Sequence, residues 1–347
     1  MIATIGLTAI GCLDSGALMS SQPGGHGETG GAAGAPGGAG RAGTGGPAGA
    51  AGTSAPSACA GGPCPVTVLA ADQMGPQTLV VTGGKVYWSN HNGNAIMAVS
   101  TEGGAPEVVV GGLSAPVVLA LDDNNLYWAD DVDRTVMSAP RGGGSPTILA
   151  RDQGQTYTLA VDALNVYWSS YDDGAVRRVP IGGGAIATLA SGEVNPGPLI
   201  LLGGNLYWPR VGAGIFVLPL AGGAGHAVPL QDFQPLSGFA IDGDGVYWTT
   251  FTGGGVYRAP LAGGATTPLA LGQGQVQCLL VDPPWVYFTT VDDDYAIGRV
   301  MRVQMDGEAL TTIAVDQVNP CGLAVDATSI YWDEVIAGGA RILKAAK

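Results

Sequence analysis

The amino-acid sequence predicts an all-β protein, a seven-bladed β-propeller built from four-stranded antiparallel blades, and three observations indicate this fold. An aromatic pair, Tyr-Trp or Tyr-Phe, occurs seven times, with five spacings of 40 residues and a last spacing of 44. Each repeat contains four short β-rich runs separated by glycine, asparagine, aspartate and proline. The last repeat ends after its third run, and a matching fourth run precedes the first repeat. Such periods are typical of propeller blades.

The aromatic pairs mark the second strand of each repeat. They begin at Tyr87, Tyr127, Tyr167, Tyr207, Tyr247, Tyr287 and Tyr331. Because propeller blades pack face to face, second-strand side chains are expected to be buried on both faces. A buried Trp removes about 150–250 Å² from water, worth roughly 4–6 kcal/mol before entropy is subtracted. We therefore interpret the pairs as the core of the protein and not as an aromatic cage for a ligand.

The other strands follow from the punctuation between the apolar runs. In the third repeat the four runs are 159–162, 166–169, 176–180 and 188–190. Consecutive glycines connect the third and fourth runs in most repeats, which predicts hairpin turns because glycine adopts positive φ without a steric penalty. An aspartate ends the first run in five repeats and is expected to accept backbone N–H bonds in the turn. These aspartates are Asp122, Asp162, Asp242, Asp282 and Asp326.

The two ends of the repeat region predict a closed ring. Residues 66–70 match the pattern of the fourth runs, and the last repeat finishes with 340–343 in the place of a third run. We expect these two segments to pair, so that the N-terminal strand completes the seventh blade. Closure of this kind removes the exposed sheet edges of an open array.

Two segments precede the propeller, which we assign to residues 64–347. Residues 1–12 resemble a bacterial lipoprotein signal, because small residues lead to Cys12, the expected lipidation site; the alternative is a cleaved secretory signal with an incidental Cys. Residues 13–63 are rich in glycine and alanine and have few side chains to bury, so they are expected to form a disordered tether. Under either interpretation of residues 1–12, the protein is expected to be exported.

The four remaining cysteines suit an exported protein with disulfides. Cys59 and Cys64 flank a tight Gly-Gly-Pro loop and are the better predicted pair. Cys278 and Cys321 precede matching strands of neighbouring repeats, but their sequence positions leave open whether they form a bridge.

The repeat resembles the YWTD propellers, the class B repeats of low-density lipoprotein receptors, and more loosely the NHL propellers. The resemblance covers residues 64–347 and depends on a Leu-x-Val-Asp run followed by Tyr-Trp, with Tyr127-Trp-Ala-Asp130 as the closest copy. Only Asp130 provides the final Asp of the motif, and the receptor domains have six blades where this sequence predicts seven. The resemblance implies an extracellular binding role without a particular ligand.

Charge and motif content exclude several function classes. A net charge of −14 argues against nucleic acid as a partner, because phosphate binding requires a basic surface. No apolar run reaches the 18 residues of a spanning helix. The sequence contains no HExxH, GxSxG or phosphate-binding loop motif, and His91 and His226 are the only histidines beyond the tether. A hydrolase would lack a visible base and nucleophile.

The candidate binding face consists of the loops that connect second to third strands and fourth to first strands, which share one face of a propeller. Many acidic residues fall in the former. The candidates there are Asp130, Asp131, Asp133, Asp172, Asp173, Asp292, Asp293, Asp294, Asp333 and Glu334, together with His91, Tyr171 and Arg210. Clustered carboxylates suit Ca²⁺. We expect solvated loop carboxylates with no cofactor, and keep a Ca²⁺ site as the alternative.

These observations predict an exported, lipid-anchored monomer of the cell envelope, in the outer membrane or periplasm. Its propeller would be a non-catalytic binding platform for a protein or glycan. If charge determines the choice of partner, we expect that partner to be basic. The alternative is a metal-dependent lactonase or lyase with an ion in the central channel, by analogy with other propellers.

Overall fold

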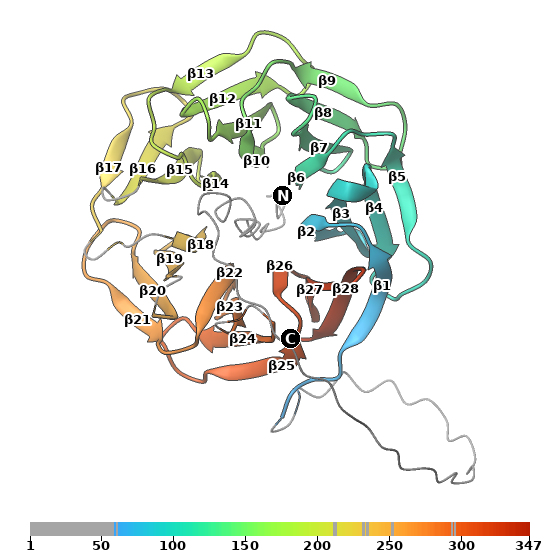
Figure 1. The fold of residues 1–347 in the computed structure, drawn as a ribbon. Helices are drawn as coiled ribbons and strands as arrows, with labels where there is room; N and C mark the ends of the chain where they lie inside the picture. Colours follow the sequence, from blue (N-terminus) through green and yellow to red (C-terminus); the bar gives the residue numbers. More distant parts are fainter. Residues whose placement is uncertain are drawn as a thin grey trace, which may run out of the picture.

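The computed structural model describes residues 59, 62–210, 214–230, 233, 236–250, 253–292, 294 and 296–347. These residues form seven four-stranded antiparallel sheets arranged around a central axis, as Figure 1 shows. The predicted signal, the tether up to residue 58 and Cys12 lie outside the described residues. The seven-bladed propeller predicted from the repeat is confirmed. Nowhere in the described chain does a helix have the length and hydropathy to cross a bilayer.

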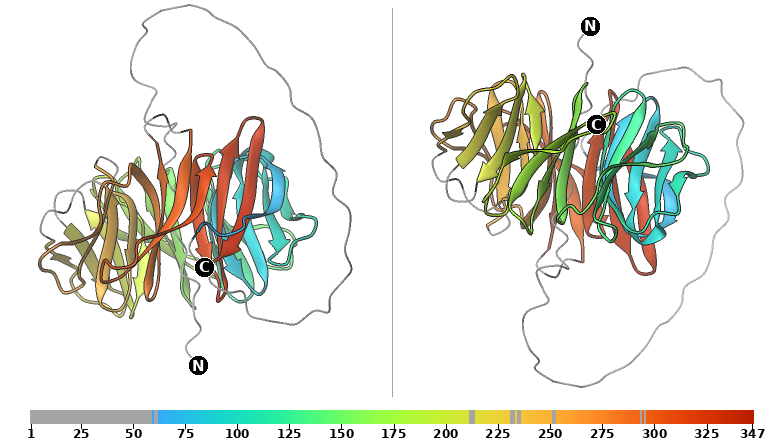
Figure 2. Two further views of the ribbon diagram at one scale, coloured as in Figure 1. Left: turned by 90° about the horizontal axis from the view of Figure 1, so that it is seen from below. Right: turned by 90° about the horizontal axis from the view of Figure 1, so that it is seen from above.

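Each blade contains four strands that run in order from the axis to the rim (Figures 1 and 2). Blade 1 contains β2 (Pro76–Thr82), β3 (Lys85–Asn90), β4 (Ala95–Ser100) and β5 (Glu107–Gly111), with the short 3-10 turn η1 (His91–Gly93) between β3 and β4. Blade 2 contains β6 (Pro116–Leu121), β7 (Asn125–Asp130), β8 (Thr135–Pro140) and β9 (Thr147–Ala150). Blade 3 contains β10 (Thr156–Val161), β11 (Asn165–Ser170), β12 (Ala175–Pro180) and β13 (Ala187–Ala190).

The remaining blades repeat this arrangement. Blade 4 contains β14 (Ile200–Leu202), β15 (Asn205–Arg210), β16 (Gly214–Pro219) and β17 (His226–Val228). Blade 5 contains β18 (Leu236–Ile241), β19 (Gly245–Thr250), β20 (Gly255–Pro260) and β21 (Thr267–Ala270). Blade 6 contains β22 (Gln275–Asp282), β23 (Trp285–Val291), β24 (Gly298–Gln304) and β25 (Thr311–Gln317). Blade 7 contains β26 (Pro320–Val325), β27 (Ser329–Ile336), β28 (Gly339–Ala346) and β1 (Thr67–Gln73).

The N-terminal strand closes the ring as predicted. β1 pairs antiparallel with β28, with Thr67 opposite Lys344 and Val68 opposite Leu343. Because the chain passes directly from β1 into β2, blade 7 is joined to blade 1 through this pairing. Leu69 and Ala70 of β1 are buried and belong to the apolar cluster between these two blades.

The aromatic pairs form the core between the blades. Seven clusters of buried side chains each contain the Tyr of one pair and the Trp or Phe of the next pair around the ring. Tyr127 of blade 2, for example, lies in one cluster with Trp168 of blade 3, and Tyr331 of blade 7 with Trp88 of blade 1. The interpretation of these pairs as core is confirmed.

Four of the five aspartates that end the first strands have a second role that the sequence interpretation missed; the fifth, Asp282, pairs with Lys347 instead. In Asp122, Oδ1 accepts the backbone N–H groups of Asn124 and Asn125 at 2.7 Å each, as predicted. Its Oδ2 accepts a hydrogen bond from the Tyr127 hydroxyl at 2.7 Å. The same Asp–Tyr bond joins residues five apart at Asp162, Asp242 and Asp326. The turn is thus tied to the aromatic core.

Replacing Tyr127 with Phe should lower the free energy of unfolding by about 1–3 kcal/mol at neutral pH, because the hydroxyl donates to a carboxylate. Burial alone would raise the pKa of Asp122, but the bonds from Tyr127, Asn124 and Asn125 outweigh it and lower that pKa. A lowered pKa in the folded state stabilises the protein above the ordinary pKa of Asp, and this contribution disappears as the pH falls through the folded value.

The loss caused by Tyr127→Phe should therefore shrink in acid, which urea denaturation at pH 7 and at low pH measures. Tyr87→Phe is the matched control, because the first repeat has Thr82-Gly83-Gly84 at this turn and no aspartate. Its effect should stay within about 0.5 kcal/mol. Equal losses in the two variants would contradict the role given to the carboxylate.

Candidate binding face

The connections between second and third strands lie on the same face of the ring as those between fourth and first strands, as expected. Backbone bonds link the two kinds of connection: His91 N–H donates to Gly75 O at 2.9 Å, and Tyr171 N–H donates to Gln155 O at 2.8 Å. We call this side the loop face. The opposite side, the turn face, carries the tight first-to-second and third-to-fourth turns, and Figure 2 shows the ring edge-on between them.

Asp130 holds the backbone of the loop face together. Its side chain is buried, and Oδ2 accepts the N–H groups of Ser114 and Ala115 at 2.9 and 3.1 Å. Its Oδ1 accepts the N–H of Asp133 at 3.1 Å. With these bonds, the carboxylate closes two neighbouring loops and does not face a ligand.

The other acidic residues of blades 2 and 3 reach the surface. Asp131 is half-buried and its pKa is raised by burial, while Asp133 accepts a hydrogen bond from the Ser114 hydroxyl at 2.6 Å. Asp172 and Asp173 are exposed. These four carboxylates lie in the second-to-third loops of two adjacent blades.

Arginines pair with the exposed acids of this region. Arg134 Nη1 lies 2.8 Å from Asp172 Oδ2 and joins blade 2 to blade 3, and this bond lowers the pKa of Asp172. Arg177 Nη2 lies 2.6 Å from Asp173 Oδ2. The surface therefore presents alternating charges at its rim and not a concentrated negative field.

Arg210, predicted as a binding residue, is instead part of a contact between blades 3 and 4. Its Nε donates to Glu193 Oε2 at 2.6 Å and its Nη2 pairs with Glu193 Oε1, so the guanidinium holds the carboxylate through two bonds. The Trp208 indole donates to the same carboxylate at 3.2 Å. The guanidinium carbon lies 3.6 Å from the centroid of the Phe216 ring. We call these four residues the Glu193 clamp.

The acids of blade 7 are buried within the sheet. Asp333 and Glu334 belong to β27 and are 2% and 1% exposed. The expectation that both lie on the binding face is therefore wrong. Glu334 accepts the Val318 N–H at 3.0 Å and pairs with Arg341. Both residues lie within β27, which continues to Ile336, rather than in the following loop, and this explains the difference.

The acids of blade 6 remain at the surface where they can be described. Asp292 Oδ1 accepts the N–H groups of Ala296 and Ile297 at 2.8 and 3.3 Å, which orders its own loop. Asp294 is exposed, and Asp293 lies outside the described residues. His91 of blade 1 contacts the neighbouring Asn92 through Nδ1 at 3.1 Å. Within the described ranges, three or more His, Cys, Asp or Glu side chains nowhere converge to hold a metal ion.

The cysteines stabilise the part of the ring near its closure. Cys59 and Cys64 form the predicted disulfide, and Cys64 N–H donates to Ile313 O of blade 6 at 2.7 Å. The sulfurs of Cys278 and Cys321 lie 2.7 Å apart, and neither cysteine is free. This second pair connects the innermost strands of blades 6 and 7, which the sequence left open.

Exposed apolar side chains on the loop face are the feature that sequence reasoning missed. Seven of the 14 exposed large hydrophobic residues in the described part of the chain lie there: Met74, Val132, Tyr171, Val194, Leu271, Ile297 and Val335. The described turn-face connections hold three, which are Leu164, Ile186 and Leu310. The other four belong to outer strands or to the residue leading into β1. Their sequence signal was weak because they come from seven separate segments of the chain and form no single motif.

The ends of the fourth strands supply a second missed feature. Gln317 Oε1 accepts the indole N–H of Trp332 in the next blade at 3.0 Å, as Glu193 does for Trp208. Asp-Gln pairs also occur at 72–73 and 152–153, but the indole N–H groups of Trp88 and Trp168 have no hydrogen-bond partner, so the Asp-Gln pair alone does not predict this bond.

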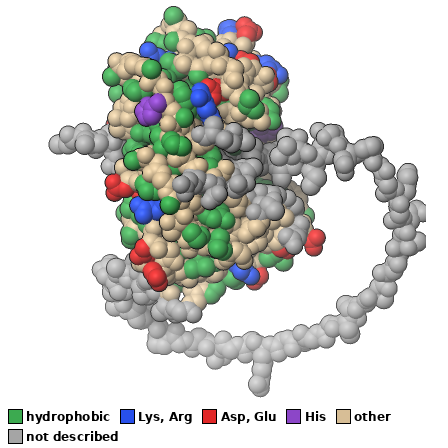
Figure 3. All heavy atoms as spheres, turned by 90° about the vertical axis from the view of Figure 1, so that its left-hand side faces the viewer, with side chains coloured by type: hydrophobic (Ala, Val, Ile, Leu, Met, Phe, Trp, Pro, Cys, Tyr) green, Lys and Arg blue, Asp and Glu red, His purple; other side chains and the backbone are tan. Residues whose placement is uncertain are grey.

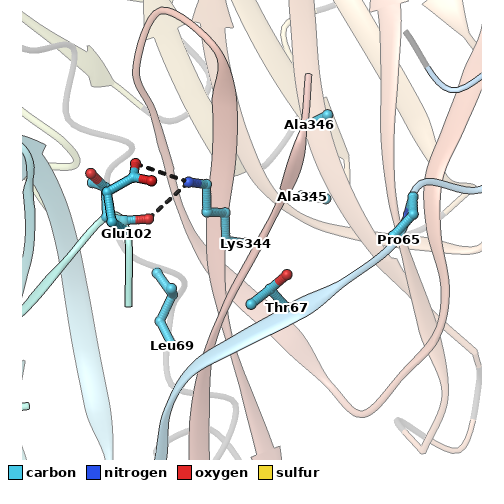
Figure 4. A pocket seen from close by; sticks show the side chains of 8 residues that line it. Pro65, Thr67, Leu69, Glu102, Lys344, Ala345 and Ala346 are labelled. Atoms are coloured by element: carbon cyan, nitrogen blue, oxygen red, sulfur yellow. Dashed lines mark hydrogen bonds and ion pairs between the residues drawn. The ribbon is translucent and has the colours of Figure 1, made fainter. Parts of the chain in front are cut away.

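A shallow depression lies at the rim where blade 7 meets blade 1 (Figure 4). It measures about 240 Å³ and its lining includes Thr67, Leu69 and Lys344. Lys344 Nζ donates to Thr101 O at 2.8 Å and lies 3.7 Å from Glu102, so its charge is already engaged. Small-molecule sites are usually about 300–1,000 Å³ and more enclosed, so this depression does not resemble one.

Comparison with known proteins supports the fold alone. Neither a protein-family model nor a curated protein sequence matches the chain. The structure is similar to a streptogramin B lyase, with a TM-score of 0.64 and 14% identity over 80% of this chain and 96% of that chain. It is also similar to the computationally designed Ika8 protein, with a TM-score of 0.58 and 17% identity over 77% and 83%. A nidogen/laminin complex matches at a TM-score of 0.48 and 20% identity, over 55% and 77%.

Proposed function

We propose that the protein is an exported propeller whose loop face binds a partner protein, with the region of blades 2 and 3 as the centre of the interface. The observation that carries this proposal is the apolar content of the loop face. Val132 and Tyr171 are 69% and 44% exposed on adjacent blades, and charged side chains surround them. Apolar and aromatic residues within a charged rim are the usual composition of a protein interface.

The charge pattern limits the partner. Asp131, Asp133, Asp172 and Asp173 share this region with Arg134 and Arg177, and the protein as a whole carries a net charge of −14. A partner with a basic or mixed surface would meet less electrostatic repulsion than an acidic one. Glycans are a further candidate, because an exposed Tyr next to carboxylates suits a sugar face.

A double substitution tests the proposed interface. Val132→Ser with Tyr171→Ala should abolish capture of the partner from envelope extracts by the immobilised full chain. The free energy of unfolding should stay within about 0.5 kcal/mol of wild type, because both side chains are exposed. Leu164→Ser on the turn face is the matched control, since Leu164 is 71% exposed. Loss of capture in the control, or retention in the double variant, would contradict the placement.

The membrane anchor is part of the same proposal. Incorporation of labelled palmitate into wild type but not into a Cys12→Ser variant tests it, and release of that variant from membranes is the expected result.

The alternative function is that of a metal-dependent lyase or lactonase. Its support is the propeller fold shared with a streptogramin B lyase, which at 14% identity is a likeness of fold only. Metal analysis of the purified protein, with melting curves in the presence and absence of Ca²⁺, tests that alternative.

A further inference from the structure

We propose that the contact between blades 7 and 1 is a proton-sensitive closure, which is tight while the Asp333 side chain is protonated and loosens when it ionises. The two blades meet along β26 and β27 on one side and β2 and β3 on the other, and β1 joins them at the rim. We call this contact the closing seam.

Asp333 lies in the closing seam without a partner for one oxygen. Its neighbour two positions earlier, Tyr331, packs in the cluster that contains Leu79 and Trp88 of blade 1. Alternate strand residues share a face, so Asp333 points to the same side. A Cβ atom placed on Gly322 would come within 2.0 Å of Asp333 Oδ1 and 3.0 Å of Leu79 Cδ1, which locates the carboxyl group between the two blades. Asp333 is 2% exposed, and its Oδ1 has no hydrogen-bond partner.

The same position holds a neutral side chain in every other blade. The residues that follow the second aromatic of each pair are Ser89, Ala129, Ser169, Pro209, Thr249 and Thr289. Two of these hydroxyls satisfy nearby backbone groups: Ser169 Oγ donates to Gly197 O of the next blade, and Thr289 Oγ1 accepts the Cys278 N–H. A carboxyl group at this place is therefore particular to the closing seam. A buried carboxylate with one oxygen left unpaired destabilises the folded state strongly, while the neutral acid does so far less.

Few charged groups face Asp333. Its strand neighbour Glu334 is paired with Arg341 of β28, and β26 contributes Cys321, which adjoins Cys278. β2 contains no ionisable residue, and Lys85 of β3 pairs with Glu107 at the other end of that strand. Burial raises the pKa of Asp333 to about 8; a hydrogen bond from its own backbone N–H opposes this shift, and the charge of Glu334 adds to it.

Loosening would be confined to one side of blade 7. The Cys278–Cys321 contact connects this blade to blade 6, whereas the closing seam depends on the β1–β28 pairing and on side-chain packing. An Asp with a raised pKa in the closed state favours closure at low pH, and this advantage decreases as the pH rises toward the folded value. With an ordinary value of 3.8 in the open state and about 8 in the closed state, the opening constant should increase by about 80-fold between pH 5 and pH 7.

Hydrogen exchange of the full chain tests this. Exchange of the β1 and β28 peptides, corrected for the intrinsic effect of pH, should accelerate by about 80-fold from pH 5 to pH 7 in wild type, while the β22 and β23 peptides change much less. Asp333→Asn and Asp333→Thr should show no such dependence, because neither side chain ionises. Threonine is the natural residue of blades 5 and 6, which makes the second variant the safer one for folding. Asp294→Asn, at an exposed acid, should behave as wild type.

A pH dependence of the β1 and β28 peptides that is the same in wild type and in Asp333→Thr would overturn the proposal. So would acceleration of all blades together, which would indicate global unfolding. The wild-type infrared spectrum supplies a readout that needs no variant. A protonated carboxyl band that persists at pH 7 and falls to about half of its intensity near pH 8 supports the proposal, and complete ionisation of all carboxyl groups by pH 6 would refute it.

Discussion

Deletion of residues 64–73 should abolish the cooperative unfolding transition of the ring, although it removes ten residues from one end of the propeller. β1 supplies the fourth strand of blade 7, and Leu69 and Ala70 pack in the cluster that contains Trp88, Tyr331 and Ile342. Without β1, the backbone groups of β28 that face the rim lose their partners and the aromatic cluster of the closing seam becomes accessible to water. We expect a loss of at least about 5 kcal/mol, comparable to the total stability of many domains.

Urea denaturation followed by Trp fluorescence measures this loss. Deletion of residues 40–49, ten residues of the tether, is the matched control and should leave the transition unchanged. A synthetic peptide covering 62–75, added to the deletion variant, should restore a cooperative transition, because the pairing with β28 and the apolar contacts do not require a covalent link. If the deletion variant unfolds at the wild-type urea concentration, the ring does not depend on β1.

Substitution of Glu193 with Ala should lower the free energy of unfolding by about 3 kcal/mol, the second large effect that we expect. The Glu193 side chain is 7% exposed and interacts with both Arg210 and Trp208. Removing it leaves a partly buried guanidinium and an indole N–H without their acceptor, and breaking a buried pair from one side is strongly destabilising. The contact also connects the loop after β13 to the second strand of blade 4.

Glu102→Ala provides the control for the loss of a glutamate from an ion pair. Glu102 is 87% exposed and lies 3.7 Å from Lys344, so its removal should change stability by less than about 0.5 kcal/mol. Glu193→Gln should be intermediate in urea denaturation, because the amide still accepts from Trp208 but loses the charge that faces Arg210. A Glu193→Ala variant as stable as Glu102→Ala would show that the Glu193 clamp contributes little.

The fold could be predicted from the sequence because its determinants are local and repeated. The Tyr-Trp pairs, the glycine turns and the aspartates each report their own strand or hairpin, and residues 66–70 share a pattern with the fourth strands. The ring follows once equal units are joined. Only the number of blades and the position of β1 required long-range inference, and both are confirmed.

The candidate site was less predictable because burial and pairing depend on the neighbouring blade. Asp130, Asp172 and Asp333 looked alike as acids that follow a second strand. Asp130 is fixed by backbone groups that lie 15 and 16 residues earlier in the chain, and Asp172 by Arg134, which lies 38 residues away. Asp333 is buried in the closing seam. Whether such a side chain points into the sheet contact or toward solvent depends on the register of its strand, because a shift of one residue turns the side chain to the other face.

The placement of both chain ends in one blade determines how the ring would respond to mechanical load. Thr67 and Lys344 lie opposite each other at one end of the β1–β28 pair. Tension between the two ends of the chain would therefore peel β1 from β28 one bond at a time, in the geometry of a zipper, before any force reached blades 2 to 6. If the tether is pulled at a membrane while a partner holds the loop face, by contrast, the strain enters at the rim through β1. The strand that completes the fold would then also be the first to detach under load.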